Sequence, residues 1–126
     1  EMDYAPAMTA LARLYLFGFG LEPDYDVAME WAHRAIIEGD KEAELLIKYA
    51  QSVNGSYKIL GLNLTRLAIE TVKKGDPSLL PRAQKNYEFV YQALTPNEIS
   101  LAVEYFPLYR KLKQIWDKRR KRWFDG

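Results

Sequence analysis

The chain has 126 residues, a length typical of one compact domain, and its 48% hydrophobic and 28% charged residues are those of a folded protein. It contains no cysteine and a single histidine, His33, which excludes disulfides, thiolate nucleophiles, cysteine-type zinc sites and multi-histidine metal sites. No apolar run reaches the roughly 18 residues that a membrane span requires, and the first residues lack the pattern of a signal peptide.

The net charge of +1 conceals an uneven distribution along the chain. Residues 110–126 hold eight basic and two acidic residues, whereas the 109 residues before them hold 10 basic and 15 acidic ones. A mildly acidic body with a basic C-terminal segment therefore needs either a structural or a functional explanation.

The pattern of apolar residues predicts an all-α chain, because no segment alternates apolar and polar residues long enough to indicate a strand. Glycine, proline and capping residues divide the chain into about seven helices. We expect them at about 5–17, 24–38, 41–53, 57–74, 80–94, 96–106 and 107–123.

Several of these boundaries have a local physical reason. Gly18 and Gly20 favour the left-handed backbone at the end of the first helix, and Asp24 is the expected N-cap of the second. The segment 95–98 (Thr-Pro-Asn-Glu) has the form of a capping box with proline at the first helical position. Pro107 restricts the residue before it, so we expect one helix to end near Phe106 and another to follow.

A weak internal repeat has a period of 36 residues. The pair Gly39-Asp40 recurs at residues 75–76, and apolar and turn positions of the first copy coincide with similar positions of the second. The second copy is degenerate, because Lys48 replaces the small Ala12 and Gln51 replaces the aromatic Tyr15. Both changes weaken a close contact between helices.

The first copy carries a specific pattern of small, aromatic and turn residues over 37 positions. Its members are Ala7, Leu11, Ala12, Tyr15, Gly18, Gly20, Asp24, Ala28, Trp31, Ala35, Gly39 and Ala43. This pattern resembles the Sel-one-like repeat, a relative of the tetratricopeptide repeat, although Ala12 stands where glycine is usual. The resemblance covers residues 5–43 well and 43–79 faintly, so we predict a repeat region at 1–79 and a helical cap at 80–126 within one compact domain.

The resemblance implies an α-solenoid of antiparallel helix pairs, because a single pair cannot bury both of its faces. We expect the chain to be the C-terminal part of an array, and residues 2–7 to correspond to the end of a preceding repeat. Proteins with such repeats are typically adaptors or scaffolds that bind a protein or peptide, and many are bacterial. The resemblance therefore favours the bacterial cell envelope, the periplasm, with the cytoplasm as the alternative.

The related tetratricopeptide geometry implies where a partner binds. The non-consensus positions of the inner helix would line a concave groove, and here they are Thr9, Arg13, Leu16 and Phe17. Arginine and aromatic residues are frequent at the energetic centres of interfaces, which favours Arg13 and Phe17 as contact residues. The alternative is that Leu16 and Phe17 pack against the next helix pair.

The last helix is amphipathic. Its apolar stripe is formed by Leu108, Leu112, Ile115, Trp116 and Trp123. Its basic patch is Lys118, Arg119, Arg120, Lys121 and Arg122, with Trp123 beside it. We interpret it as a capping helix with a solvated outer face, or else as a binder of an anionic partner: an acidic protein, an anionic lipid or, least favoured because no base-reading motif accompanies it, nucleic acid.

No residue pattern indicates catalysis. His33 has no patterned acid or nucleophile near it, the glycines form no phosphate-binding loop, and the acidic segment 38–44 reads as a solvated turn without calcium-loop spacing. We therefore expect no catalytic residue, metal or cofactor, and a non-catalytic adaptor or scaffold. The alternative function is an anionic-surface binder acting through the basic C-terminal helix.

Overall fold

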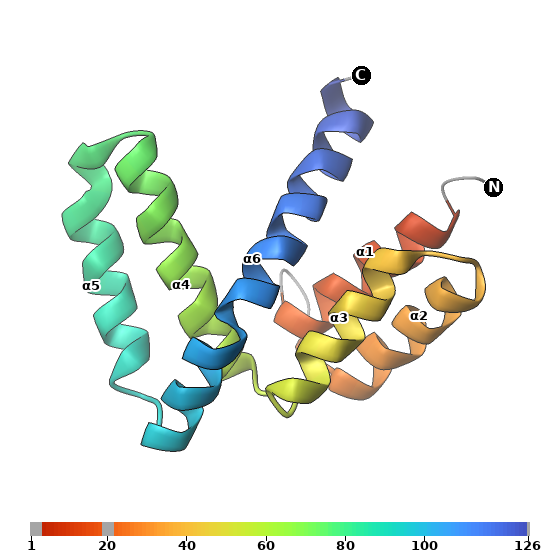
Figure 1. The fold of residues 1–126 in the computed structure, drawn as a ribbon, viewed down its shortest axis with the longest axis horizontal. Helices are drawn as coiled ribbons and strands as arrows, with labels where there is room; N and C mark the ends of the chain where they lie inside the picture. The colour runs from red at the N-terminus through yellow and green to blue at the C-terminus, as the bar shows by residue number, and fades with distance from the viewer. Residues whose placement is uncertain (1–3, 19–21, 126) are drawn as a thin grey trace.

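The computed structural model describes residues 4–18 and 22–125, with side chains as far as residue 121. This part of the chain is all-α, as predicted, and contains no strand (Figure 1). Its elements are α1 (Tyr4–Phe17), α2 (Tyr25–Ile37), α3 (Lys41–Ser52), α4 (Tyr57–Lys74), the 3₁₀ helix η1 (Pro77–Leu79), α5 (Leu80–Tyr91) and α6 (Pro96–Asp125).

The prediction of about seven helices is wrong at one place, because α6 continues through Pro107 as a single helix of 30 residues. Proline inside a helix removes one hydrogen bond and crowds the carbonyl four residues earlier, at a cost of about 3 kcal/mol. Residues on both sides of it are buried, among them Phe106, Tyr109 and Leu112. Burying such large apolar side chains contributes about 1.5–3 kcal/mol each, which outweighs the local cost of Pro107.

The other predicted helix boundaries agree with the structure to within about two residues, except that the helix predicted at 80–94 ends at Tyr91. Asp24 caps α2 by accepting a hydrogen bond from the amide of Val27 (3.1 Å). Thr95 and Glu98 form the capping box of α6, in which each backbone amide donates to the other residue's side chain (2.8 and 3.2 Å). Gly18 ends α1 with a positive φ of 75°, which glycine adopts without strain; Gly20 lies outside the described residues.

Small residues allow α1 and α2 to pack closely as an antiparallel pair. Ala12, Ala28, Ala32 and Ala35 are all fully buried, and their small side chains leave room for the two helices to approach each other. The α1–α2 pair corresponds to the part of the sequence with the complete repeat pattern.

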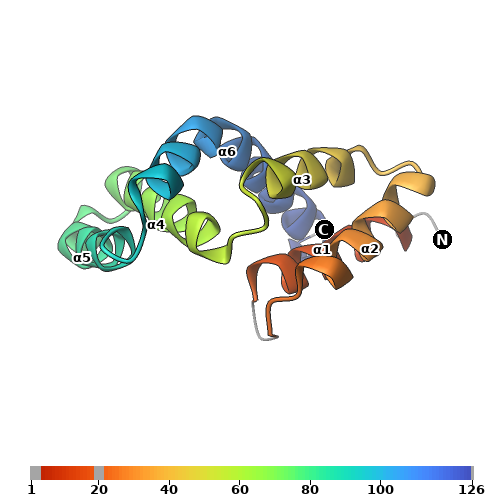
Figure 2. The ribbon, with the colours of Figure 1, turned by 90° about the horizontal axis from the view of Figure 1, so that it is seen from below.

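The helices of the degenerate copy, α3 and α4, do not run alongside each other. α2 packs against α3, α4 pairs with α5, and α6 packs against both α3 and α4. Figures 1 and 2 show the α1–α2 and α4–α5 pairs at opposite ends of the molecule, with α3 alongside the α1–α2 pair and α6 between the two ends. Lys48 and Gln51, which replace the small and aromatic residues of the first copy, are exposed on α3.

The turn after α3 packs against the first residue of α2, Tyr25. Asn54 and Gly55 have positive φ values of 58° and 64°. A Cβ atom on Gly55 would lie 2.4 Å from the ring of Tyr25 at the start of α2, so only glycine fits this position without a shift of the ring.

One hydrophobic core of buried residues joins α1, α2, α3, α4 and α6, and Tyr87 and Val90 of α5 pack against it. α6 contributes Ala102, Phe106, Tyr109, Leu112 and Trp116 to it. Two of these residues, Tyr109 and Trp116, contact Phe17 of α1. Among the described residues, no helix combines the length and the apolar character needed to cross a membrane.

Candidate partner-binding surface

The four residues predicted to line a groove lie on α1 and face other parts of the chain. Thr9 and Leu16 are buried, and Arg13 and Phe17 are half-buried. Thr9, Arg13 and Phe17 contact side chains of α3 or α6, whereas Leu16 belongs to the core and borders a hollow beside Tyr25, Gly55 and Tyr57. We call the surface formed by Thr9, Arg13 and Phe17 of α1 with Asp40 and Glu42 at the start of α3 the α1–α3 surface.

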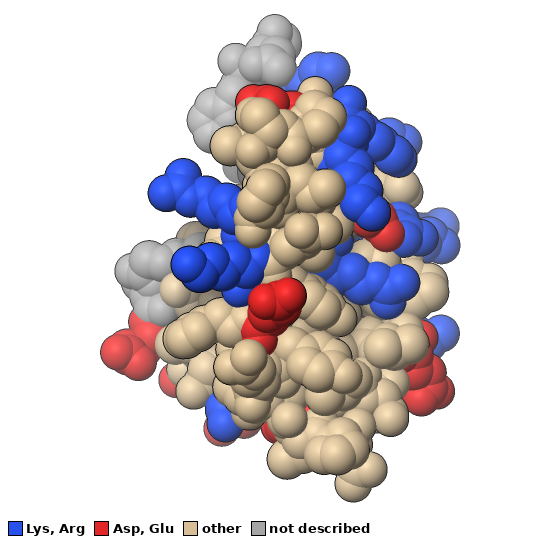
Figure 3. All heavy atoms as spheres, turned by 90° about the vertical axis from the view of Figure 1, so that its left-hand side faces the viewer, with Lys and Arg blue, Asp and Glu red and all other residues tan. Residues whose placement is uncertain are grey.

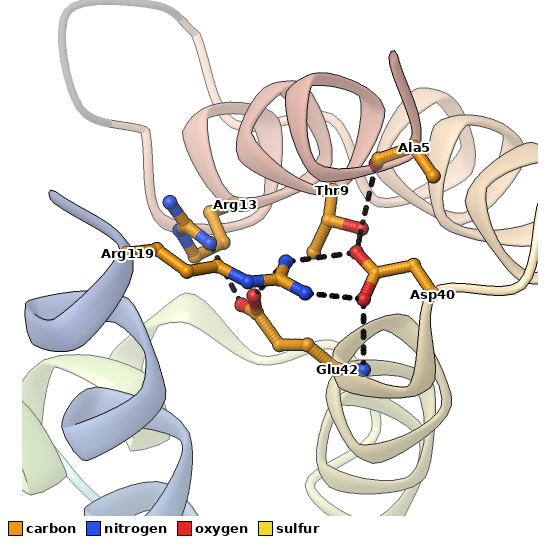
Figure 4. A network of polar contacts seen from close by, with 6 residues as sticks. All are labelled: Ala5, Thr9, Arg13, Asp40, Glu42 and Arg119. Carbon is orange, nitrogen blue, oxygen red and sulfur yellow. Dashed lines mark hydrogen bonds and ion pairs between the residues drawn. The ribbon is translucent and has the colours of Figure 1, made fainter. Parts of the chain in front are cut away.

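Two carboxylates form the acidic centre of this surface (Figure 4). Asp40 caps α3 by accepting from the amide of Glu42 (3.1 Å), and the Thr9 hydroxyl donates to its other oxygen. Glu42 forms an ion pair with Arg13, whose guanidinium donates a hydrogen bond to the carboxylate (2.7 Å). The side chains of Asp40 and Glu42 are each only 1% exposed, so their charges lie where unpaired charge is costly.

Arg119 of α6 completes the ion pairs of both carboxylates, as Figure 4 shows. Its two terminal nitrogens donate to both oxygens of Asp40 (2.6 and 2.9 Å), and one of them also donates to Glu42 (2.6 Å). This two-pronged contact is the strongest arrangement available between arginine and a carboxylate. It joins residues that are 79 and 77 positions apart in the sequence.

Trp116, one turn before Arg119, is the second residue of α6 that the α1–α3 surface holds. Its ring and that of Phe17 are nearly perpendicular (centroids 5.2 Å apart, planes at 82°), and the guanidinium of Arg13 lies 5.0 Å from the centroid of the Trp116 ring. Tyr109 contacts Phe17 and Trp116 from within α6 (5.9 Å each). The α1–α3 surface therefore holds an indole and a guanidinium from one face of a helix.

Burial and ion pairing shift the pKa values of the two carboxyls in opposite directions. Burial alone raises the pKa of Asp40, but hydrogen bonds from Arg119 and Thr9 outweigh it and hold that pKa below the ordinary 3.8. Burial raises the pKa of Glu42 above the ordinary 4.5, against the opposing charges of Arg13 and Arg119. Asp40 receives the larger number of hydrogen bonds, which explains why pairing prevails there and burial prevails at Glu42.

The predicted basic patch separates into an inward and an outward part. Arg119 points to the α1–α3 surface, whereas Lys118, Arg120 and Lys121 are exposed. Figure 3 shows the face on the left-hand side of Figure 1, where lysine and arginine side chains lie on both sides of an uncharged ridge in the upper part of the view. The side chains of Arg122 and Trp123 lie outside the described residues.

Sequence reasoning missed both carboxylates. The interpretation of residues 38–44 as a solvated turn is wrong at Asp40 and Glu42, which are buried. The position of Asp40 after Gly39 and before a helix is the signal of an N-cap, but nothing local indicates that its partner is Arg119 of the basic segment. His33 is exposed on α2.

No family model, no curated protein and no solved structure matches this chain. The resemblance of residues 5–43 to the Sel-one-like repeat thus depends on the sequence pattern alone. Among the described side chains, no group of histidine, aspartate and glutamate residues has the arrangement of a metal site.

Proposed function

We propose that this protein is a non-catalytic interaction module, an adaptor or scaffold, whose α1–α3 surface binds a helix of a partner protein. One observation carries the proposal: this surface, which contains three of the four predicted groove residues, already holds a helix, namely the C-terminal half of the chain's own α6. Placing an amphipathic helix against a groove is a common mode of protein recognition.

The occupied state makes α6 an internal competitor of any partner. A helix tethered to its own binding surface has an effective concentration on the order of millimolar, so a partner helix binds only when it outcompetes α6 or when α6 is loosened. We propose that the α1–α2 pair acts as one Sel-one-like unit of a helical solenoid and that α4, α5 and α6 close it. The burial of the alanines between α1 and α2 supports this proposal.

Several observations support a function without catalysis. The two buried carboxylates are both engaged in ion pairs with arginine, and His33 is exposed on the outside of α2. Arg110 pairs with Glu70 through two hydrogen bonds (3.2 and 2.6 Å) in the charged hollow between α4 and α6.

Binding of a peptide with the sequence of residues 105–121 tests this function. We expect a fluorescently labelled peptide to bind the Arg119→Ala protein at least about tenfold more tightly than the unmodified protein, because the variant's own helix competes less well. Fluorescence anisotropy measures both affinities. The Arg120→Ala protein, which loses the same charge from an exposed position, should behave like the unmodified protein. Equal binding to all three proteins, or no binding to any, would contradict the proposal.

A second candidate function is supported by the exposure of Lys118, Arg120 and Lys121. These side chains can attract an anionic surface while Arg119 remains engaged with α3. We then expect the protein to co-sediment with vesicles containing phosphatidylserine, and this binding to fall steeply between about 50 and 200 mM salt. Replacing the three exposed residues by alanine should abolish it; binding that is insensitive to salt would rule this function out.

A further inference from the structure

The chemistry of the α1–α3 surface specifies the kind of helix that it accepts. Trp116 and Arg119 are three residues apart, so they project from the same face of α6, one turn from each other. Their neighbours Lys118 and Arg120 are exposed. The contacts of the C-terminal half of α6 with α1 and α3 thus centre on these two side chains and not on the general basic character of the helix.

The guanidinium contact requires arginine rather than a positive charge alone. Arg119 uses two nitrogens in one plane to reach both oxygens of Asp40 while it also donates to Glu42. A lysine ammonium is a single point of charge and cannot reproduce this planar, two-pronged geometry. We expect the surface to discriminate between the two residues for this reason.

The indole contact requires a large aromatic ring. Trp116 is buried, and it contacts both the perpendicular ring of Phe17 and the guanidinium of Arg13. A cation over an aromatic face prefers tryptophan to tyrosine or phenylalanine, and an aliphatic side chain offers neither the ring face nor the edge contact.

The acidic centre is held in place by residues of α1 and α3 themselves. The amide of Glu42 and the hydroxyl of Thr9 donate to Asp40, and Arg13 donates to Glu42, without any contribution from α6. A surface that is ordered before its ligand arrives loses less entropy on binding. The carboxylates are therefore positioned to receive a guanidinium from another helix in place of Arg119.

α6 is an imperfect occupant of this surface. The hydroxyl of Tyr109 and the indole nitrogen of Trp116 are buried and make no hydrogen bond within the described part of the protein. A buried polar group without a partner costs about 1–3 kcal/mol. A partner helix with an apolar residue in place of Tyr109 would avoid one of these costs.

From these contacts we infer that the α1–α3 surface selects an amphipathic helix of a partner protein that carries tryptophan and, three residues later, arginine. Asp40 and Glu42 recognise the guanidinium, and Phe17 and Arg13 recognise the indole. This inference rests on the proposed function and names the partner's chemistry. In this chain, Trp116 and Arg119 of α6 are the tryptophan and arginine that occupy the surface.

Peptide variants test the inference with the Arg119→Ala protein as receptor. The probes are the peptide of residues 105–121 and its Trp116→Ala, Arg119→Ala, Arg119→Lys and Arg120→Ala forms. We expect the first three variants to bind about tenfold or more weakly than the parent peptide, and the Arg120→Ala peptide to bind within about twofold of it. The Arg119→Ala and Arg120→Ala peptides have the same net charge, so their difference measures the specific contact.

Equal affinity of all five peptides would overturn the inference while leaving the proposed helix binding intact, whereas absence of binding by every peptide would overturn both. Circular dichroism checks that the receptor keeps its helicity, and the Arg119→Lys protein serves as a second receptor. Sedimentation of the unmodified protein should show a monomer. A dimer that the Arg119→Ala change abolishes would identify a second copy as the occupant and overturn the assignment to another protein.

Discussion

Replacing Arg119 by alanine should lower the free energy of unfolding by about 3 kcal/mol, because it leaves two buried carboxylates with one arginine between them. Asp40 loses both prongs of its ion pair and keeps only the Thr9 hydroxyl and the backbone amide of Glu42. Urea denaturation followed by circular dichroism measures the change. We expect most of the helical signal to persist in the absence of urea, since the α4–α5 pair does not depend on Arg119.

The matched control for this prediction is Arg120→Ala. Arg120 is exposed, and its ion pair with Asp117 is long (3.6 Å) and open to solvent. Such pairs contribute about 0–1 kcal/mol, so this variant should unfold almost as the unmodified protein does. A loss of less than about 1 kcal/mol for Arg119→Ala would show that the ion pairs of Figure 4 do not hold α6 in place.

The stability difference between the unmodified and Arg119→Ala proteins should also depend on pH. Asp40 has a lowered pKa, so its contribution is complete above its ordinary pKa of 3.8 and is lost as the pH falls through the lower pKa of the folded state. Glu42 has a raised pKa, so its protonation begins above 4.5 and relieves the cost of its buried charge. In acid, both protonations remove a charge with which Arg119 pairs. We therefore expect the difference in free energy of unfolding between the two proteins to be largest near neutral pH and to become smaller as the pH falls.

Replacing Trp116 by alanine should lower the free energy of unfolding by about 3–4 kcal/mol, which is typical of a large aromatic residue removed from a core. The change removes the ring contacts with Phe17 and Tyr109. It also removes the aromatic ring over which the guanidinium of Arg13 lies. Chemical denaturation again gives the magnitude. The Trp116→Phe variant should recover much of the loss, because it keeps an aromatic ring and removes the unpaired indole nitrogen.

Gln114→Ala provides the control for Trp116→Ala, because Gln114 lies on the same turns of α6 and is exposed. It should change stability by no more than about 0.5 kcal/mol. If Trp116→Ala were as mild as this control, the C-terminal half of α6 would not be packed on α1 as described.

Much of the local structure could be predicted from the sequence because its causes are local. Asp24 and the Thr95–Glu98 pair cap helices through hydrogen bonds within four residues. The alanines between α1 and α2 belong to helices joined by a short connection, so their pattern indicates the contact directly. These features depend on neighbours in the chain, which a single sequence displays.

The position of α6 could not be predicted, because its causes are distant in the sequence. Pro107 is a local signal for a helix end, but burial of Phe106 and Tyr109 on either side of it prevails. The pairing of Arg119 with Asp40 and Glu42 depends on a return of the chain after almost 80 residues. The sequence of the basic segment indicates a uniform solvated face, although Arg119 is half-buried in ion pairs with Asp40 and Glu42.

Hydrogen exchange of the Arg119→Ala protein tests most directly whether the α1–α3 surface binds helices. With a ¹⁵N-labelled protein and an unlabelled peptide of residues 105–121, NMR reports the amides of the protein alone. We expect the peptide to slow exchange in α1 and at the start of α3, and to speed it in residues 108–121 of the protein's own α6. Exchange in α1 and α3 that the peptide leaves unchanged, or protection gained only on α4 and α5, would contradict helix binding at this surface.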